Sequence, residues 1–138
     1  MSSSPTFEDR LEIHELLGRY YQLLDGESSI SSASIFTDDG AIVVPTGQFL
    51  GLETIDDFFT KRPSDAGRNG RHFISNLVVA ASGEGVARAD FYLQYVGIVP
   101  APVLKMTGRG ECDLVRTTGG WRMRQLRIHI DGSPNPHD

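Results

Sequence analysis

"RHFISNLVVAASGEGVARADFYLQYVGI", residues 71–98, decides the fold of this chain. Apolar and polar residues alternate through both halves of the stretch, which is the pattern of β-strands with one buried face. The turn Gly83–Glu84–Gly85 between the halves indicates an antiparallel hairpin. The alternation returns in residues 104–118 and 121–131, which Gly119–Gly120 joins, so we predict a long run of antiparallel strands.

Helical periodicity precedes this run. In residues 5–26 an apolar stripe recurs at spacings of three and four, with Thr6 placed to cap the helix and Gly26 to end it; the stripe is Ile13, Leu17, Tyr20 and Leu24. A second amphipathic helix is predicted over residues 52–62, with Leu52, Ile55, Phe58 and Phe59 as its apolar face. Between the two helices we predict a shorter helical piece around 28–36 and short strands over 40–45 and 48–51.

The helical patterns mostly come first in the chain and the strand patterns second, and this order predicts an α+β architecture. We expect a strongly curved, mixed but mostly antiparallel sheet wrapped around the N-terminal helices, with Gly97, Gly108 and Gly110 where the sheet bends. Such an α+β cone encloses a cavity of the kind in which small ligands bind. The 138 residues suit a single domain over 1–138, with its core over about 7–132 and frayed ends.

Composition narrows the classes of partner. The net charge is −5 and the basic residues are scattered, which argues against nucleic acid or an anionic membrane as the main partner. The single cysteine, Cys112, cannot form an internal disulfide, and neither a signal peptide nor a membrane-spanning run is present. We therefore expect a cytoplasmic protein.

Two residues are candidates for proton chemistry. Asp25 ends the first helix, on a stripe shared with His14 and Tyr21, and His72 opens a strand directly after a Gly-rich loop. Each has an ordinary structural interpretation: Asp25 as part of an Asp-Gly turn, and His72 as a polar residue at a strand end that alternates with Ile74, Asn76 and Val78. A contact between the two would favour function, because a carboxylate can orient an imidazole and stabilise its protonated form.

Motifs for a cofactor or metal are missing from the sequence. "HELLG" at 14–18 has Gly18 where a zinc helix would need its second histidine, and there is no phosphate loop, nucleophile elbow or CxxC pair. We therefore expect no cofactor and no metal, and chemistry that depends on side chains alone.

The chain resembles the SnoaL-like branch of the nuclear-transport-factor-2-like superfamily, closest to the scytalone dehydratase and hexachlorocyclohexane dehydrochlorinase group. The resemblance covers about residues 7–132 and is carried by "IHELLGRYYQLLD", "IFTDDGAIVV", "GLETIDDFF", "RHFISNLVV" and "VRTTGGWRMRQLRIHIDG". It implies that Asp25 and His72 act as a dyad in which the histidine takes a proton from carbon, and that Arg116 helps to place a leaving group. The second histidine of the dehydratase and the lysine of the dehydrochlorinase have no counterpart here, so neither exact reaction is implied. The resemblance also implies a homo-oligomer, a dimer or trimer.

The sequence thus favours a cofactor-free lyase or isomerase, dehydratase-like, acting on a small apolar or aromatic substrate in a conical pocket. His72 and Asp25 would be catalytic, and Tyr21, Tyr92 or Tyr95 could donate a hydrogen bond to the substrate. Two alternatives stay open at this point. One is a polyketide cyclase or epoxide-opening enzyme of secondary metabolism, and the other is a non-catalytic module that binds a small ligand.

Overall fold

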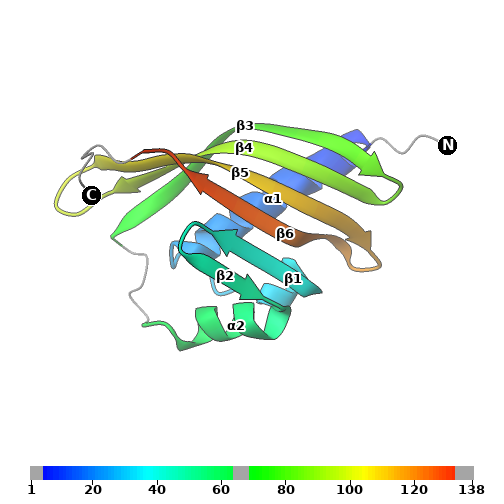
Figure 1. Ribbon diagram of the computed structural model, residues 1–138, viewed down its shortest axis with the longest axis horizontal. Coiled ribbons are helices and arrows are strands. Elements are labelled where there is room, and N and C mark those ends of the chain that lie inside the picture. The colour runs from blue at the N-terminus through cyan, green and yellow to red at the C-terminus, as the bar shows by residue number, and fades with distance from the viewer. Residues whose placement is uncertain (1–4, 64–68, 133–138) are drawn as a thin grey trace.

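The first helix, α1 (Phe7–Leu24), lies across one face of a six-stranded sheet (Figure 1). The computed structural model describes residues 5–63 and 69–132 of the chain. α1 begins with a capping box, in which the Thr6 hydroxyl accepts a hydrogen bond from the Asp9 N–H and the Asp9 carboxylate accepts one from the Thr6 N–H. These bonds satisfy N–H groups that the start of a helix leaves without partners, which confirms the predicted cap.

The sheet has the strand order β2-β1-β6-β5-β4-β3. Its strands are β1 (Phe36–Val44), β2 (Gly47–Leu50), β3 (Gly70–Gly83), β4 (Val86–Gly97), β5 (Val103–Thr117) and β6 (Gly120–Ile130). Among the strand pairs of the described residues only β1–β6 is parallel, so the predicted mixed, mostly antiparallel sheet is confirmed. The second helix, α2 (Leu52–Lys61), packs beside β1 and β2, away from the long strands (Figure 1).

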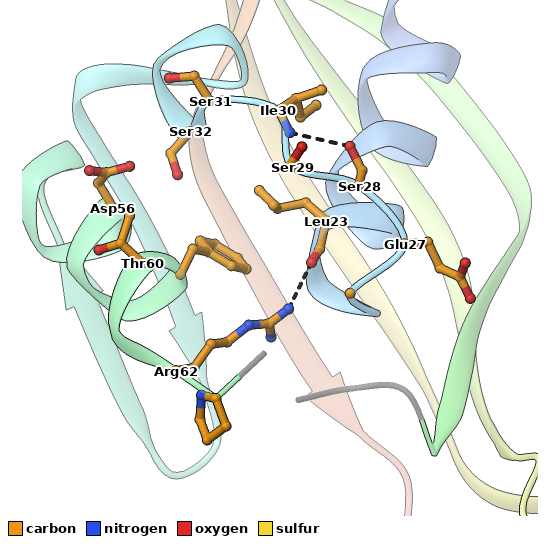
Figure 2. A pocket seen from close by; sticks show the side chains of 13 residues that line it. Leu23, Glu27, Ser28, Ser29, Ile30, Ser31, Ser32, Asp56, Thr60 and Arg62 are labelled. Carbon is orange, nitrogen blue, oxygen red and sulfur yellow. Dashed lines mark hydrogen bonds between the residues drawn. The ribbon is translucent and has the colours of Figure 1, made fainter. Parts of the chain in front are cut away.

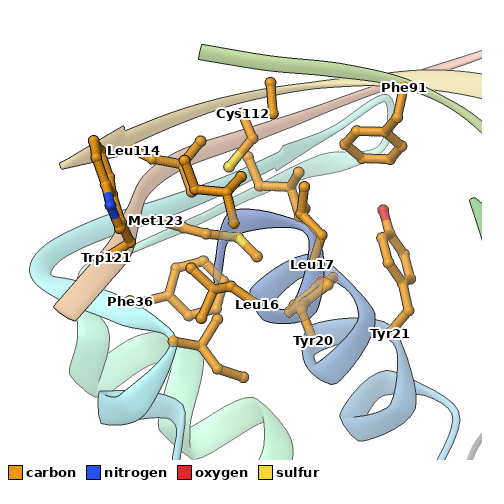
Figure 3. Packing of buried hydrophobic residues seen from close by; sticks show 14 of the residues in the cluster. Leu16, Leu17, Tyr20, Tyr21, Phe36, Phe91, Cys112, Leu114, Trp121 and Met123 are labelled. Carbon is orange, nitrogen blue, oxygen red and sulfur yellow. The ribbon is translucent and has the colours of Figure 1, made fainter. Parts of the chain in front are cut away.

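The core fills the space between α1 and the inner faces of β4, β5 and β6 (Figure 3). Ile13, Leu17 and Tyr20 of the predicted stripe are buried, whereas Leu24 is half-buried. The side chains that meet them include Phe36, Phe91, Cys112, Leu114, Trp121 and Met123. α2 adds Ile55, which is fully buried, and Phe59, which is partly so.

The prediction of a helical piece around residues 28–36 is wrong in the length of the helix. Only a 3₁₀ turn, η1 (Ser32–Ser34), forms there, and β1 begins at Phe36 rather than at residue 40. The reason is long-range pairing: Phe36 is 2% exposed and pairs with Met123 of β6, whose N–H donates to the Ile35 carbonyl at 2.7 Å. Contacts with the last strand therefore override the local pattern.

The predicted alternation of His72, Ile74, Asn76 and Val78 is also wrong beyond Ile74. The pairing of β3 with β4 shifts between Ser75 and Val78, and Asn76 has a positive φ of 54°, so one extra residue bulges from β3 at this point. After the bulge the faces exchange: Val78 is 64% exposed, while Val79 is 5% exposed and belongs to the core.

Asp9 joins the start of α1 to the far end of the sheet. Its carboxylate accepts a hydrogen bond from the Trp121 indole N–H at 3.0 Å and from the Arg116 guanidinium at 2.6 Å. The backbone N–H of Trp121 donates to the Glu12 carboxylate at 2.6 Å, one helical turn further on. The hydrogen bond from Trp121, with smaller contributions from Thr6 and Arg116, holds the pKa of Asp9 below its usual value.

Asp9→Asn is expected to lower the free energy of unfolding at pH 7 by about 1 kcal/mol, allowing for solvent screening. Because the pKa of Asp9 is lowered in the folded state, its stabilisation is complete above the unfolded value near 3.8 and is lost as the pH falls through the folded value. Urea unfolding should therefore show a difference in the free energy of unfolding between the wild type and Asp9→Asn that is smaller at pH 3 than at pH 7. The exposed Asp38→Asn serves as control, and a gap of equal size at both pH values would contradict this role of Asp9.

Candidate active site

Asp25 is held at the end of α1 as its C-cap residue, with only 5% of its surface exposed. A helix C-terminus disfavours a carboxylate, so a buried Asp there needs strong partners. The guanidinium of Arg62, just after α2, donates to the Leu23 carbonyl at 2.8 Å and brings positive charge to the same helix end. Gly26, with φ of 79°, then turns the chain away from the helix.

Both carboxylate oxygens of Asp25 bind His72. Oδ2 accepts the backbone N–H of His72 at 2.9 Å, and Oδ1 lies 2.6 Å from the imidazole Nδ1. An ionised carboxylate only accepts hydrogen bonds, so this contact requires a proton on Nδ1, and in the neutral tautomer that meets this requirement Nε2 is the unprotonated nitrogen. The side chains are 18% and 7% exposed for His72 and Asp25, so little water competes for this contact. The contact that the family resemblance implies is therefore formed, although the two residues lie 47 positions apart.

His72 lies in the wall of an apolar cavity of about 290 Å³ on the inner face of the sheet. α1 provides Tyr20, Tyr21 and Leu24 to this cavity, and α2 provides Phe58. The remaining walls come from all six strands and the β1–β2 turn: Ile42, Val44, Pro45, Phe49, His72, Leu93, Met106, Ile128 and Ile130. Asp25 does not line the cavity, so the imidazole separates the carboxylate from the space where a ligand would lie.

Two tyrosines flank the imidazole. The ring of Tyr21 lies 5.3 Å from the ring of His72, and the ring of Tyr95 lies 4.7 Å from it, measured between centroids. Tyr21 lines the cavity, is 4% exposed, and its hydroxyl has no hydrogen-bond partner among the described residues. Burial raises the pKa of Tyr21 well above its usual value, so the phenol stays protonated.

Tyr92 and Arg116 are not brought to this site. Tyr92 is 58% exposed. Successive side chains of a strand point to opposite faces, and the neighbours of Tyr92, Phe91 and Leu93, are buried on the inner face of β4, so Tyr92 points to the outer face. Arg116 binds Asp9 and stacks over Trp121 near the start of α1, the opposite end of the helix from Asp25. Neither residue lines the cavity beside His72.

The hydroxyl of Tyr95 also lies away from the cavity, over the backbone of Gly70. A Cβ atom at Gly70 would lie 2.4 Å from the Tyr95 hydroxyl oxygen, so only glycine permits this packing. Tyr95 is absent from the cavity wall, and it faces His72 as the directly paired residue of β4. Tyr95 is therefore placed to support the imidazole, and its hydroxyl is not placed to donate a hydrogen bond into the cavity.

Gly70→Ala is expected to push the Tyr95 ring out of its position and to loosen His72. A clash with a packed ring typically costs about 1–3 kcal/mol of stability. We expect a lower midpoint of thermal unfolding and altered ¹H–¹³C signals of the His72 imidazole. Gly132→Ala is a matched control because a Cβ there meets nothing within 4 Å. Unchanged imidazole signals in Gly70→Ala would contradict the supporting role of Tyr95.

A larger hollow of about 640 Å³ lies between the end of α1, the following serine-rich segment and α2 (Figure 2). Arg62 spans it to reach the Leu23 carbonyl, and much of its wall is hydroxyl-bearing, from Ser28, Ser29, Ser31, Ser32 and Thr60. It contains neither His72 nor Asp25. The smaller, apolar cavity is the one with access to the imidazole, so we assign the candidate active site to it.

Metal ligands do not converge in residues 5–63 and 69–132: no three His, Cys, Asp or Glu side chains form a group suited to a metal ion. Neither of the described helices has both the length and the apolar character needed to cross a membrane.

The cavity walls on β5, β6 and β2 were not identified from the sequence. Met106, Ile128 and Phe49 lie on strands whose alternation indicates a buried face. That signal separates inside from outside, but it does not show which inward side chains border a cavity and which pack in the core.

Comparison with known proteins gives the family. The model of the SnoaL-like domain matches residues 5–127. A protein of unknown function with a cystatin-like fold from Nostoc punctiforme has a TM-score of 0.77 and 25% identity, over 91% of this chain and 93% of its own. An NTF2-like protein from Novosphingobium aromaticivorans also has a TM-score of 0.77 and 25% identity, over 92% of this chain and 85% of its own.

LinA shares the fold, with a TM-score of 0.76 at 16% identity, over 93% of this chain and 90% of its own. No curated protein matches the sequence. The fold expected from the sequence, the cystatin-like α+β cone, is confirmed by these structures. Because the family model matches nearly the whole chain, this protein belongs to the SnoaL-like domain family.

Proposed function

We propose that this protein is a lyase or isomerase of the dehydratase-like kind, which removes a proton from carbon in a small, largely apolar substrate. The observation that carries this proposal is the His72–Asp25 dyad, with Nδ1 and Oδ1 at 2.6 Å, set in the wall of an apolar cavity. Membership of the SnoaL-like family supports a domain that binds or transforms small molecules.

In the proposed reaction His72 Nε2 accepts the proton of a substrate C–H bond. The electron pair of that bond moves toward a neighbouring carbonyl, or it expels a leaving group on the adjacent carbon. The imidazolium is stabilised by Asp25 through the Nδ1–H, and Nε2 then returns its proton to another substrate carbon or to the leaving group. General acid–base catalysis by such a group typically contributes about 10²–10⁴-fold to the rate.

The environment of Asp25 favours this reaction over carboxylate chemistry. A cyclase or epoxide-opening enzyme that depended on Asp25 would need a carboxylate oxygen facing the substrate. Here Oδ1 binds the imidazole and Oδ2 binds the backbone N–H of the same residue. With both oxygens engaged by His72, the carboxylate supports the imidazole instead.

The test is catalysed exchange of carbon-bound hydrogen for solvent deuterium, which reports proton abstraction whatever product the full reaction forms. Small neutral ketones such as 1-indanone, incubated with the protein in D₂O, should lose their α-hydrogen signals faster than with buffer alone. Exchange that depends on His72 supports proton abstraction. A wild-type protein that gives no exchange above buffer with any ketone tested, or a His72→Ala variant that exchanges at the wild-type rate, would oppose it and leave a binding module as the better interpretation.

A further inference from the structure

We propose that Phe58 is the gate of the apolar cavity and that Arg62 is the latch that holds this gate closed. Phe58 lies in the second half of α2, and Arg62 follows the last residue of that helix. Together the two side chains set how fast an apolar ligand reaches His72 and leaves again. The proposal concerns access to the cavity, so it goes beyond the proposed reaction and does not depend on proton transfer.

The mouth of the cavity is marked by the wall residues that are also exposed to solvent. These are Pro45, Phe58 and Ile130, whereas the other wall residues are buried or half-buried. Pro45 belongs to the tight turn between the paired strands β1 and β2, and Ile130 pairs with Gly108 of β5. Phe58 is 37% exposed and stands on a helix instead, so it is the mouth residue that no strand pairing holds in place.

The helix that carries Phe58 is held less firmly than the strands around the cavity. Its start at Gly51 has no side-chain cap, and of its ten residues, all of them described, Ile55 is the buried one. Phe59 meets Tyr20 of α1 edge-on, at 6.2 Å between ring centroids, but beside that contact lies the hollow of about 640 Å³ (Figure 2). Few buried contacts and an uncapped start are typical of segments that open locally.

Arg62 joins α2 to α1 across this hollow, as Figure 2 shows. Its guanidinium donates to the Leu23 carbonyl at 2.8 Å, close to the C-terminal end of α1. The Arg62 Cζ also lies 5.8 Å from the ring centroid of Phe58 and 5.2 Å from that of Phe59. A cation over an aromatic ring and a cation at a helix C-terminus are both favourable. Arg62 thus contacts the gate residue itself and fixes it to the neighbouring helix.

A latch of this kind changes the rates of binding and leaves the affinity unchanged. The cavity wall includes Phe58 but not Arg62, so the loss of Arg62 removes no contact with a bound ligand. It raises the fraction of molecules in which the gate is open. Ligand then enters and leaves faster by the same factor, and Kd stays constant as long as the closed state predominates.

The experiment uses benzene as the probe, because an engineered apolar cavity of ~150 Å³ holds this molecule. NMR titration of the ¹⁵N-labelled protein gives Kd, and relaxation dispersion at partial saturation gives the dissociation rate constant. Arg62→Met should raise both rate constants about 5-fold, the effect of one lost hydrogen bond, and leave Kd within about 2-fold of the wild type. Lys61→Met is the matched control, since Lys61 is 76% exposed and pairs with Asp57 of its own helix.

Phe58→Leu tests the gate directly and does not depend on the folding of Arg62→Met. A smaller side chain at the mouth should raise the association rate constant by a factor similar to that of Arg62→Met. Phe7→Leu is the control for this change, because Phe7 is 83% exposed at the start of α1 and does not line the cavity.

Three outcomes would overturn the proposal. They are wild-type rate constants in both variants, a weaker Kd in Arg62→Met at an unchanged association rate constant, and no binding of benzene up to its solubility limit. Benzene has no acidic hydrogen, so the test is separate from that of proton transfer. Gated binding without deuterium exchange would contradict the proposed reaction alone, and exchange with ungated binding would contradict the gate alone.

Discussion

Asp25→Asn is expected to lower the rate of catalysed deuterium exchange by about 10²–10⁴-fold, close to the loss expected for His72→Ala. The substitution replaces one oxygen by an NH₂ group and hardly changes the volume of the side chain. Its effect should therefore come from hydrogen bonding and charge rather than from packing. We expect the largest functional effect in this protein from these two residues.

The backbone of His72 determines how the new amide would turn. At Asp25, Oδ2 accepts the His72 N–H at 2.9 Å, and an asparagine can accept there only with its single carbonyl oxygen. Its NH₂ group then faces Nδ1, where Oδ1 now lies at 2.6 Å. A donor facing Nδ1 requires an unprotonated Nδ1, so the proton moves to Nε2. The nitrogen proposed to accept the substrate proton is thereby already occupied.

Asp25→Asn can be checked at two levels. ¹⁵N NMR of the labelled histidine distinguishes the two ring tautomers and should show the proton on Nδ1 in the wild type and on Nε2 in the variant. Asp56→Asn, at an exposed position of α2, is the matched control and should leave both tautomer and exchange rate unchanged. An Asp25→Asn protein with the altered tautomer and a wild-type rate would refute His72 as the base.

Much of the fold follows from local pattern. The capping box at Thr6, the stripe through Ile13, Leu17 and Tyr20, and the hairpins at Gly83–Gly85 and Gly119–Gly120 each rest on residues close in the chain. Such features can be predicted because the residues that decide them are neighbours. The start of β1 at Phe36 could not, since it depends on pairing with Met123.

The site was predictable only in part, for the same reason. Asp25 and His72 stand at an identifiable helix end and strand start, and the family resemblance suggested that they meet. The alternation of β4 could have placed Tyr92 outside, but it could not show that the Tyr95 hydroxyl lies over Gly70. The bulge at Asn76 has no clear local signal, and the dimer or trimer that the family implies stays a prediction.

Gly108→Ala is expected to lower the free energy of unfolding by about 2–3 kcal/mol, the upper part of the usual range for overpacking. A Cβ at Gly108 would lie 2.3 Å from the His129 carbonyl oxygen of β6 and 3.3 Å from the Cα of Ile130, its paired residue. These are backbone atoms, so no side-chain rotation relieves the clash and β5 must separate from β6. Both strands line the cavity, with Met106, Ile128 and Ile130, so the catalysed deuterium exchange should slow as well.

Gly18→Ala should instead raise the free energy of unfolding. Gly18 lies in the interior of α1, a Cβ there meets nothing within 4 Å, and alanine is favoured over glycine in a helix by about 0.5–1 kcal/mol. Urea unfolding should thus show a higher midpoint for Gly18→Ala and a lower one for Gly108→Ala, with similar slopes. Removing backbone freedom from the unfolded chain helps both variants alike, so the difference between them measures the close approach of β5 and β6. If Gly108→Ala were as stable as the wild type, the two strands would have to lie further apart than the structure places them, and the cavity wall they form would have a different shape.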